Sequence, residues 1–209
     1  MFYTVKFNAT ACNAMSAARP RDGRNGLRDT LIEAGIALLE DAGIGGLTLR
    51  RAAARAGVSH AAPAYHFDGL QGLKNAIARR GFELFLAQLA QVLARPAPQP
   101  FARLLACNLA YIGFADAHPG LFHVMFEEAD HGRDAGLRQV AQECHDVLGM
   151  ICAPFSGGDA ALAPAVWALT HGFAVLHLGQ ARPDRPLPAQ DYERHLRLLL
   201  ADRIDAAGR

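Results

Sequence analysis

The segment Leu47–Phe67, LTLRRAAARAGVSHAAPAYHF, sets the architecture of this chain, because it has the pattern of a short helix, a tight turn and a second short helix. Thr48 is a suitable N-cap, since its hydroxyl can accept a hydrogen bond from a free amide of the first turn. Small apolar residues then recur at helical spacing, and arginines take the opposite face. Gly57 supplies the backbone freedom for the turn, and Ser59 is placed to cap the next helix. The alanines on both helices allow the close crossing that a helix-turn-helix requires.

Helical patterns flank this segment on both sides. Leu27–Asp41 carries an apolar stripe and ends at Gly43, and a long helix is predicted from about Leu70 to Ala94. Further along the chain, Asp134 and Asp159 are expected N-caps. Five more helices are predicted at 100–117, 119–129, 134–152, 159–181 and 189–206. Because no alternating β-branched run of useful length occurs, the sequence predicts an all-α chain.

The composition is that of a globular protein whose two halves differ in charge. Hydrophobic residues make up 51% of the 209 residues. No run of about eighteen apolar residues occurs, so no membrane-spanning segment is predicted. Arg19 to Arg80 contain ten Lys/Arg and six Asp/Glu, whereas Gly81 to Arg209 contain ten and fourteen. A basic N-terminal half and an acidic C-terminal half suit a domain that binds a polyanion, attached to a second domain.

The cysteines and the N-terminus bear on localisation. The four cysteines lack the spacing of a metal site, so we expect buried, reduced thiols of a cytoplasmic protein, with redox sensing as the alternative. The first residues, MFYTVKFNATACNAMSAARP, lack the apolar core of a signal peptide. We expect a flexible leader over residues 1–23, with Met15 as an alternative start of the protein.

Four segments together resemble the N-terminal domain of the TetR family of transcriptional regulators. They are RDTLIEAGIALLEDAG, LTLRRAAARAGVS, HAAPAYHF and GLQGLKNAIARRGF, which keep the family's order and spacing between Leu27 and Phe85. The HAAP run, with Trp167 and the later His171–Gly172 pair, is similar to a subset of the family that has a Trp-His-Gly signature in its C-terminal domain. AHPGLFHVMF, residues 117–126, also resembles that domain.

The resemblance implies an N-terminal helix-turn-helix domain of three helices, joined by a long helix to a C-terminal helical domain for ligand binding and dimerisation. We place the DNA-binding domain at residues 24–69 and the second domain at residues 70–209. The implied function is a sequence-specific dimeric repressor that a small molecule releases from its operator. The implied partners are double-stranded operator DNA, palindromic in sequence, an unidentified small-molecule effector and a second copy of the chain. No cofactor, metal or membrane is implied.

By the same resemblance, the helix predicted at Ser59–His66 enters the major groove, and the start of the preceding helix contacts phosphates. The expected DNA-binding residues are Thr48, Arg50, Ser59, His60, Ala62, Tyr65, His66 and Lys74. Two positions depart from the family's pattern, since Ala64 stands where a tyrosine is usual and Leu70 where a lysine is usual. Both substitutions remove a phosphate contact. Lys74, one turn later, is the expected replacement, and a solvated surface lysine is the alternative.

A second set of residues is expected around a ligand pocket in the C-terminal part. Aromatic and apolar side chains at helical spacing favour either an ordinary core or a mostly apolar cavity with a few polar groups. The expected ligand-binding residues are Phe101, Leu105, Cys107, Asn108, Tyr111, Phe122, His123, Phe126, Trp167 and His171. Trp167 and His171 share one face of a helix, where His171 is either a hydrogen-bonded core residue or part of the pocket.

The sequence also bears on two other classes of function. The sequence contains no GxSxG, phosphate-binding loop or dinucleotide motif, and its histidines lack the pairing of a helical zinc site, so an enzyme is not expected. Ala64 and Leu70 favour a rival hypothesis, an all-helical ligand- or protein-binding module with weak or lost DNA affinity. Salt-dependent binding to a few DNA fragments distinguishes the two.

Overall fold

A computed structural model describes residues 23–131, 134–178 and 189–204, and all the regular structure within these ranges is helical. The predicted all-α fold is therefore confirmed. The leader expected at residues 1–23 lies outside the described residues, apart from Gly23.

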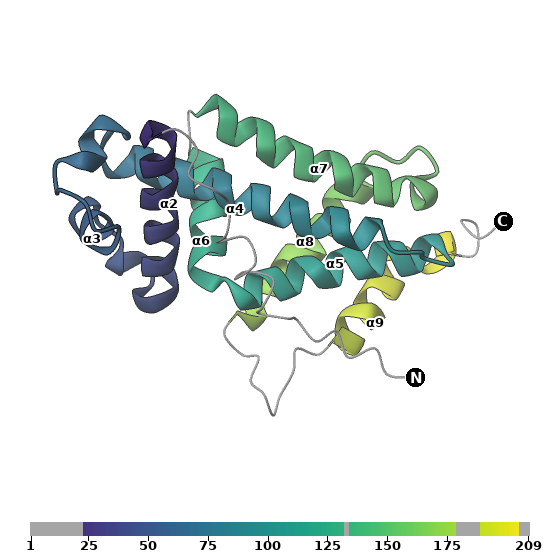
Figure 1. The fold of residues 1–209 in the computed structure, drawn as a ribbon. Helices are drawn as coiled ribbons and strands as arrows, with labels where there is room; N and C mark the ends of the chain where they lie inside the picture. Colours follow the sequence, from purple (N-terminus) through teal and green to yellow (C-terminus); the bar gives the residue numbers. More distant parts are fainter. Residues whose placement is uncertain (1–22, 132–133, 179–188, 205–209) are drawn as a thin grey trace.

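The N-terminal part consists of one helix of 20 residues and three short elements, gathered at one end of the molecule (Figure 1). They are α2 (Gly23–Ala42), η2 (Ile44–Gly46), α3 (Leu49–Arg55) and η3 (Ala62–Tyr65). As predicted, the Thr48 hydroxyl caps α3 by accepting a hydrogen bond from the Arg51 amide at 3.2 Å. Gly57 has a φ of 70°, which only glycine adopts without strain, and it makes the turn after α3.

The predicted helix Ser59–His66 is shorter and tighter than expected, since only the 3-10 helix η3 forms there. Its backbone bonds join residues three apart, including Ala62 N to Ser59 O at 2.9 Å and His66 N to Pro63 O at 3.0 Å. Pro63 contributes no amide proton, and its ring is buried. The Ser59 hydroxyl accepts from the Ala61 amide at 3.3 Å, which closes a local turn instead of capping an α-helix.

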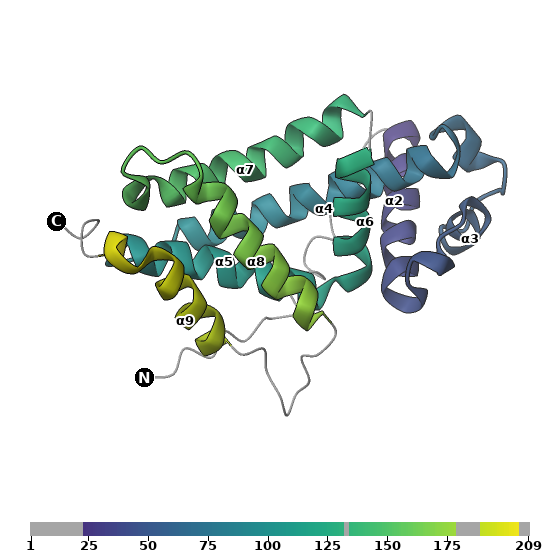
Figure 2. The ribbon, with the colours of Figure 1, turned by 180° about the vertical axis from the view of Figure 1, so that it is seen from behind.

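The long helix α4 (Gly69–Leu93) runs from this end into the C-terminal part, which contains five more α-helices (Figures 1 and 2). They are α5 (Pro100–Ala117), α6 (Pro119–His131), α7 (Ala135–Ser156), α8 (Leu162–His177) and α9 (Ala189–Leu200), followed by the 3-10 turn η4 (Ala201–Arg203). Helix α4 packs against α2, α5, α6 and α7, and α8 packs against α5, α7 and α9.

Helix ends differ most from the sequence-based prediction around Asp159. The predicted cap of α7, Asp134, accepts from the Leu137 amide at 2.8 Å as expected. Asp159 was predicted to cap α8, but α8 begins one turn later, at Leu162. The Asp159 carboxylate instead accepts from the Ala161 amide at 2.9 Å and from Arg203 at 2.9 Å. These two bonds hold it in the loop, and residues 179–181 of the predicted helix lie outside the described residues.

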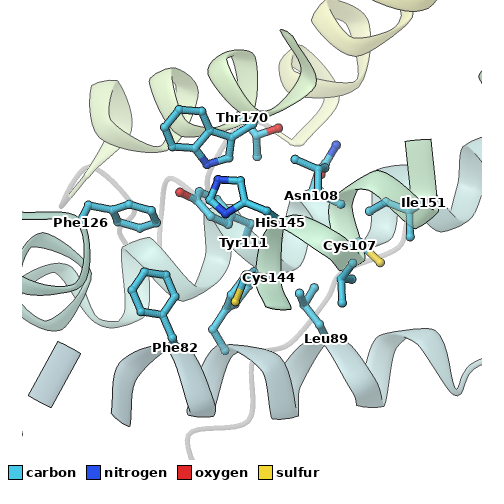
Figure 3. A pocket seen from close by; sticks show the side chains of 14 residues that line it. Phe82, Leu89, Cys107, Asn108, Tyr111, Phe126, Cys144, His145, Ile151 and Thr170 are labelled. Carbon is cyan, nitrogen blue, oxygen red and sulfur yellow. The ribbon is translucent and has the colours of Figure 1, made fainter. Parts of the chain in front are cut away.

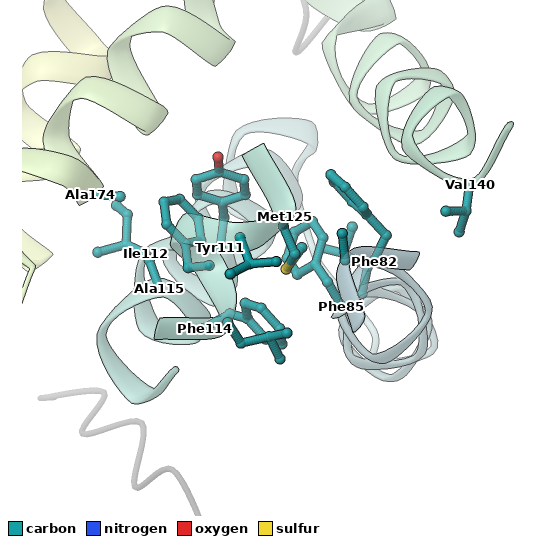
Figure 4. Close-up of a cluster of buried hydrophobic side chains, with 14 of the residues drawn as sticks. Phe82, Phe85, Tyr111, Ile112, Phe114, Ala115, Met125, Val140 and Ala174 are labelled. Atoms are coloured by element: carbon teal, nitrogen blue, oxygen red, sulfur yellow. The ribbon is translucent and has the colours of Figure 1, made fainter. Parts of the chain in front are cut away.

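The core of the C-terminal part is an aromatic cluster between α4, α5 and α6 (Figure 4). The Phe85 ring contacts the rings of Tyr111 and Phe114, with centroids 5.3 and 5.4 Å apart. Glycines let α6 approach its neighbours closely. A Cβ added to Gly81 of α4 would lie 2.6 Å from the side chain of Met125 of α6, so this side chain packs directly against the backbone of α4.

Candidate functional site

The surface around α3 and η3 presents cations and polar groups to solvent. Arg50 is exposed, and neither it nor Arg51 has an ion-pair partner among the described residues. Arg55 differs, because its guanidinium contacts the Asp41 carboxylate at 2.5 Å. Arg50 is therefore available to bind a phosphate. The Thr48 hydroxyl accepts the capping bond and can still donate its own proton to a phosphate oxygen.

The polar residues predicted to face DNA lie together in the turn and in η3. Ser59 and His60 are exposed, Ala62 and His66 are half-buried, and Tyr65 is 79% exposed. Exposure of such a large ring to water is unfavourable unless another molecule covers it. These five residues thus form one solvent-facing patch next to Arg50, which can offer hydroxyl, imidazole and phenol groups to a polyanion.

Lys74 is placed differently from the other predicted DNA-binding residues. Its side chain is only 19% exposed and lies 3.3 Å from Oε1 of Glu128 and 3.9 Å from Oε2 of Glu127. Glu128 is 3% exposed and also accepts a hydrogen bond from Gln71. Lys74 therefore neutralises a buried carboxylate at the junction of α4 and α6, and this pairing competes with the predicted phosphate contact.

A cavity of about 50 Å³ lies among α4, α5, α6, α7 and α8 in the C-terminal part. Phe82 and Leu89 of α4 point into it toward the side chains of α5 and α7 (Figure 3). The predicted ligand-binding residues that line it are Cys107, Asn108, Tyr111, Phe126 and Trp167. The structure thus brings half of the predicted set together around one cavity.

The other predicted ligand-binding residues lie elsewhere. Phe122 and His171 do not line the cavity and stack on each other, and Leu105 is partly buried against the core. The Arg197 guanidinium lies over the Phe101 ring, 4.1 Å from the ring centroid. His123 faces solvent, with a side chain that is 60% exposed and 3.6 Å from Glu127. The helical spacing that suggested these residues did not reveal which face of each helix meets the cavity.

Nine lining residues were not predicted. Most belong to α4 and α7, whose faces toward α5 form two walls of the cavity. They are Phe82, Phe85, Leu89, Cys144, His145, Val147, Leu148, Ile151 and Thr170. The spacing of Cys144, Val147, Leu148 and Ile151, at i, i+3, i+4 and i+7, is the signal in the sequence that points to an inward face of α7.

Aromatic stacking fixes the position of His171 beside the cavity. Its ring stacks on Trp167 with centroids 5.1 Å apart and on Phe122 at 5.6 Å, and its Nδ1 lies 2.7 Å from the Tyr111 hydroxyl. Burial raises the pKa of Tyr111 well above its usual range, so the phenol stays protonated. His171 is thus a half-buried residue whose hydrogen bond orients Tyr111, which lines the cavity.

A chain of hydroxyl groups links the cavity wall to α9. The Thr170 hydroxyl donates to the Val166 carbonyl at 2.7 Å, so it accepts in its 2.7 Å contact with the Tyr192 hydroxyl. Tyr192 is fully buried, and burial raises its pKa above the usual range. Asn108 lies near this phenol, yet its Nδ2 makes no hydrogen bond of regular geometry within the described residues.

The cysteines near the cavity are protonated thiols. Burial raises the pKa of Cys107 and of Cys152 to about 11, and that of Cys144 to about 12. Since a thiolate is the reactive form, these three groups are poor nucleophiles and poor metal ligands at neutral pH. No cluster of three or more potential metal ligands occurs among the described residues.

An apolar face covers the outer side of the last two α-helices. Leu176 of α8 is 72% exposed and Leu198 of α9 is 71% exposed, and Val175 and Leu199 lie beside them in sequence and are also exposed. An apolar face of this kind is typical of a surface that another protein covers. No helix in the described part of the chain is both long enough and apolar enough to span a membrane.

Comparison with known proteins finds a family model and solved structures that match this chain. Residues 104–202 match the family model for the tetracyclin repressor-like C-terminal domain. A protein of unknown function from Rhodococcus sp. RHA1 is 30% identical, with a TM-score of 0.71 over 85% of this chain and 95% of that one. A member of the TetR family from Streptomyces coelicolor A3 is 27% identical, with a TM-score of 0.60 over 83% and 97%.

A third structure shares the fold at lower identity. AibR, solved in complex with isovaleryl coenzyme A and operator DNA, is 17% identical, with a TM-score of 0.60 over 85% of this chain and 98% of that one. None of the curated protein sequences gives a significant match to the chain.

Proposed function

Since the chain belongs to the TetR family of DNA-binding transcriptional regulators, which are not enzymes, we propose that it is a dimeric repressor released from its operator by a small molecule. The DNA-binding part comprises residues 24–69, and the effector-binding and dimerisation part comprises residues 70–209. The observation that carries the proposal is the presence, in one chain, of an exposed cationic helix-turn-helix and a separate apolar cavity joined by α4.

The DNA contacts fall on the patch next to α3. Arg50 and Thr48 contact phosphates, and Ser59, His60 and Ala62 face the bases, where a hydroxyl, an imidazole and a methyl group can read base edges. The high exposure of Tyr65 supports a contact of its phenol with the backbone, in place of the usual tyrosine one position earlier. His66, half-buried, lies at the edge of the same surface.

Release by a ligand requires that DNA and ligand favour different conformations of the dimer. Helix α6 is built to transmit such a difference. Its Phe126 lines the cavity, its Glu128 holds Lys74 of α4, and Gly120 lies against α2, where an added Cβ would meet the Leu39 carbonyl oxygen at 2.7 Å. A ligand that enlarges the cavity would displace α6 and, with it, the helix-turn-helix.

The apolar face of α8 and α9 supplies the dimer contact. Two copies joined by a two-fold axis place two recognition surfaces on one DNA duplex, so the operator should contain two inverted half-sites. AibR, which shares this fold, was solved in complex with isovaleryl coenzyme A and operator DNA, and this supports a protein with both kinds of partner.

Selection of bound genomic fragments tests the proposal. The wild-type protein should enrich a few fragments, with an affinity that falls steeply as salt is raised. Arg50→Ala should weaken every fragment alike and lower the salt slope by about one, because one phosphate contact is lost. His60→Ala should instead change the ranking of fragments, at a cost of about 1–3 kcal/mol for the base it reads.

Arg103→Ala is the matched control, since it removes an exposed cation from α5, away from the helix-turn-helix. It should leave both ranking and salt slope unchanged. If no fragment is enriched even at low salt, the chain is not a DNA-binding repressor, and the ligand- or protein-binding module becomes the better description. An unchanged ranking for His60→Ala would place the base-reading surface elsewhere.

A further inference from the structure

We propose that the effector is a small, electrically neutral molecule with a flat aromatic body and one hydrogen-bond acceptor, such as an aryl ketone. This inference rests on the proposed function, because it takes the cavity described above as the effector site. It specifies the charge, shape and polar group of the ligand, which follow from three separate properties of the cavity wall.

The first property is the absence of charge. None of the residues lining the cavity, all of them described, is an aspartate, glutamate, lysine or arginine. An ion moved from water into such surroundings loses its hydration without gaining a partner, which is unfavourable. The histidine of the lining, His145, donates from Nδ1 to the Ala141 carbonyl, 2.9 Å away. The wall therefore selects against carboxylates and amines.

The second property is the concentration of rings. Phe82, Phe85, Tyr111, Phe126 and Trp167 all line the cavity. Phe82 and Phe126 meet edge to face, with centroids 5.5 Å apart, and an additional flat ring can join them by stacking or by an edge contact. Since aromatic pairs gain energy beyond burial of area, a flat ligand is favoured over a branched aliphatic one of equal size.

The third property is a buried donor without a regular acceptor. Asn108 is 4% exposed and lines the cavity, and its Nδ2 lacks a hydrogen-bond partner of regular geometry. The Tyr192 oxygen lies near this amide but not in regular hydrogen-bond geometry, so a carbonyl or ether oxygen of a ligand in the cavity is a suitable acceptor for Nδ2. A ligand with such an oxygen satisfies a group whose burial otherwise costs free energy.

The size of the cavity sets an upper limit on the ligand in this conformation. A volume of about 50 Å³ holds only a few water molecules, so even a single substituted ring must push the helices apart. A small ligand therefore suffices to change the spacing of α4, α6 and α7. This agrees with a ligand that acts by expanding the cavity.

Four aromatic probes of nearly equal size test two of these properties, the absence of charge and the unsatisfied donor. Acetophenone is neutral and carries a carbonyl, ethylbenzene lacks the acceptor, and benzoate and benzylammonium carry opposite charges. Affinity is measured by isothermal titration calorimetry on the full-length protein. The indole N–H resonance of Trp167, the one tryptophan of the sequence, reports whether a probe enters the cavity.

Acetophenone should bind at least about tenfold more tightly than benzoate or benzylammonium and should shift the Trp167 resonance. It should also bind about tenfold more tightly than ethylbenzene, because only acetophenone accepts from Asn108. In Asn108→Leu this second preference should fall to about twofold, since the donor is gone. Asn75→Leu makes the same change on α4, outside the cavity, and should keep the full preference.

Equal or tighter binding of either charged probe overturns the inference, and so does the absence of any Trp167 shift at millimolar probe. Equal losses in Asn108→Leu and Asn75→Leu would show that Asn108 does not contact the ligand. The proposed function fails separately. If acetophenone binds as expected but never changes affinity for the enriched DNA fragments, the ligand class stands and release from the operator does not.

Discussion

Glu128 is the residue on which the junction of α4 and α6 depends. Its carboxylate is 3% exposed and is held by Lys74 and Gln71. Lys74→Met would leave this charge buried with only the Gln71 amide, so it should lower the free energy of unfolding by about 3 kcal/mol. Lys74→Met combined with Glu128→Gln removes both charges and should recover most of that loss. Urea denaturation monitored by circular dichroism measures both.

Arg79→Met serves as the control for this residue, because Arg79 and Glu83 form an exposed i,i+4 pair. Its loss should cost less than about 0.5 kcal/mol. If Arg79→Met and Lys74→Met lowered the free energy of unfolding equally, burial of Glu128 would not explain the contribution of its ion pair with Lys74. The sequence indicated a cation at Lys74 but not its partner, since Glu128 lies 54 positions away and on another helix.

At the scale of elements, the close approach of α6 to α2 is the contact most sensitive to volume. A methyl group at Gly120 would lie 2.7 Å from the Leu39 carbonyl oxygen, which is backbone and cannot turn aside. Gly120→Ala should therefore destabilise the protein by about 1–3 kcal/mol and alter the response of DNA binding to ligand. A shift in the urea midpoint, together with DNA binding with and without acetophenone, measures the two effects.

Gly149→Ala is the matched change inside α7, where an added Cβ meets nothing within 4 Å. It should stabilise the protein by about 0.5–1 kcal/mol, because alanine favours a helix. If both alanine variants lowered stability alike, the close packing of α6 on α2 would not be the cause.

Local chemistry explains why most helices, but not all their ends or partners, were predictable. Thr48 and Asp134 cap their helices as expected, because capping involves only residues close in sequence. Asp159 does not, because Arg203, far along the chain, holds its carboxylate in the loop. The lining of the cavity was only partly predictable for the same reason. Apolar spacing marks the buried face of one helix, but it does not show which other helix that face will contact.

At the scale of the whole molecule, the exposed leucines of α8 and α9 predict how the protein assembles. Leu176→Glu or Leu198→Glu places a charge in the proposed dimer contact and should convert the dimer to a monomer in sedimentation velocity experiments. Operator affinity should fall with it, because one recognition surface then binds alone. Ile44→Glu, an exposed apolar residue next to α3, is the control for assembly and should leave the dimer intact.

The hydroxyl chain from Thr170 to Tyr192 has a consequence for how the protein responds to dilution. Thr170 lines the cavity, and its partner belongs to α9, whose outer side carries Leu198. A displacement of Thr170 in the cavity wall therefore reaches, through this hydrogen bond, the helix that we propose as part of the dimer contact. Because linkage is reciprocal, a ligand that loosens the pair must itself bind more tightly to separated chains. The sensitivity of the switch would then vary with the number of copies of the protein in a cell.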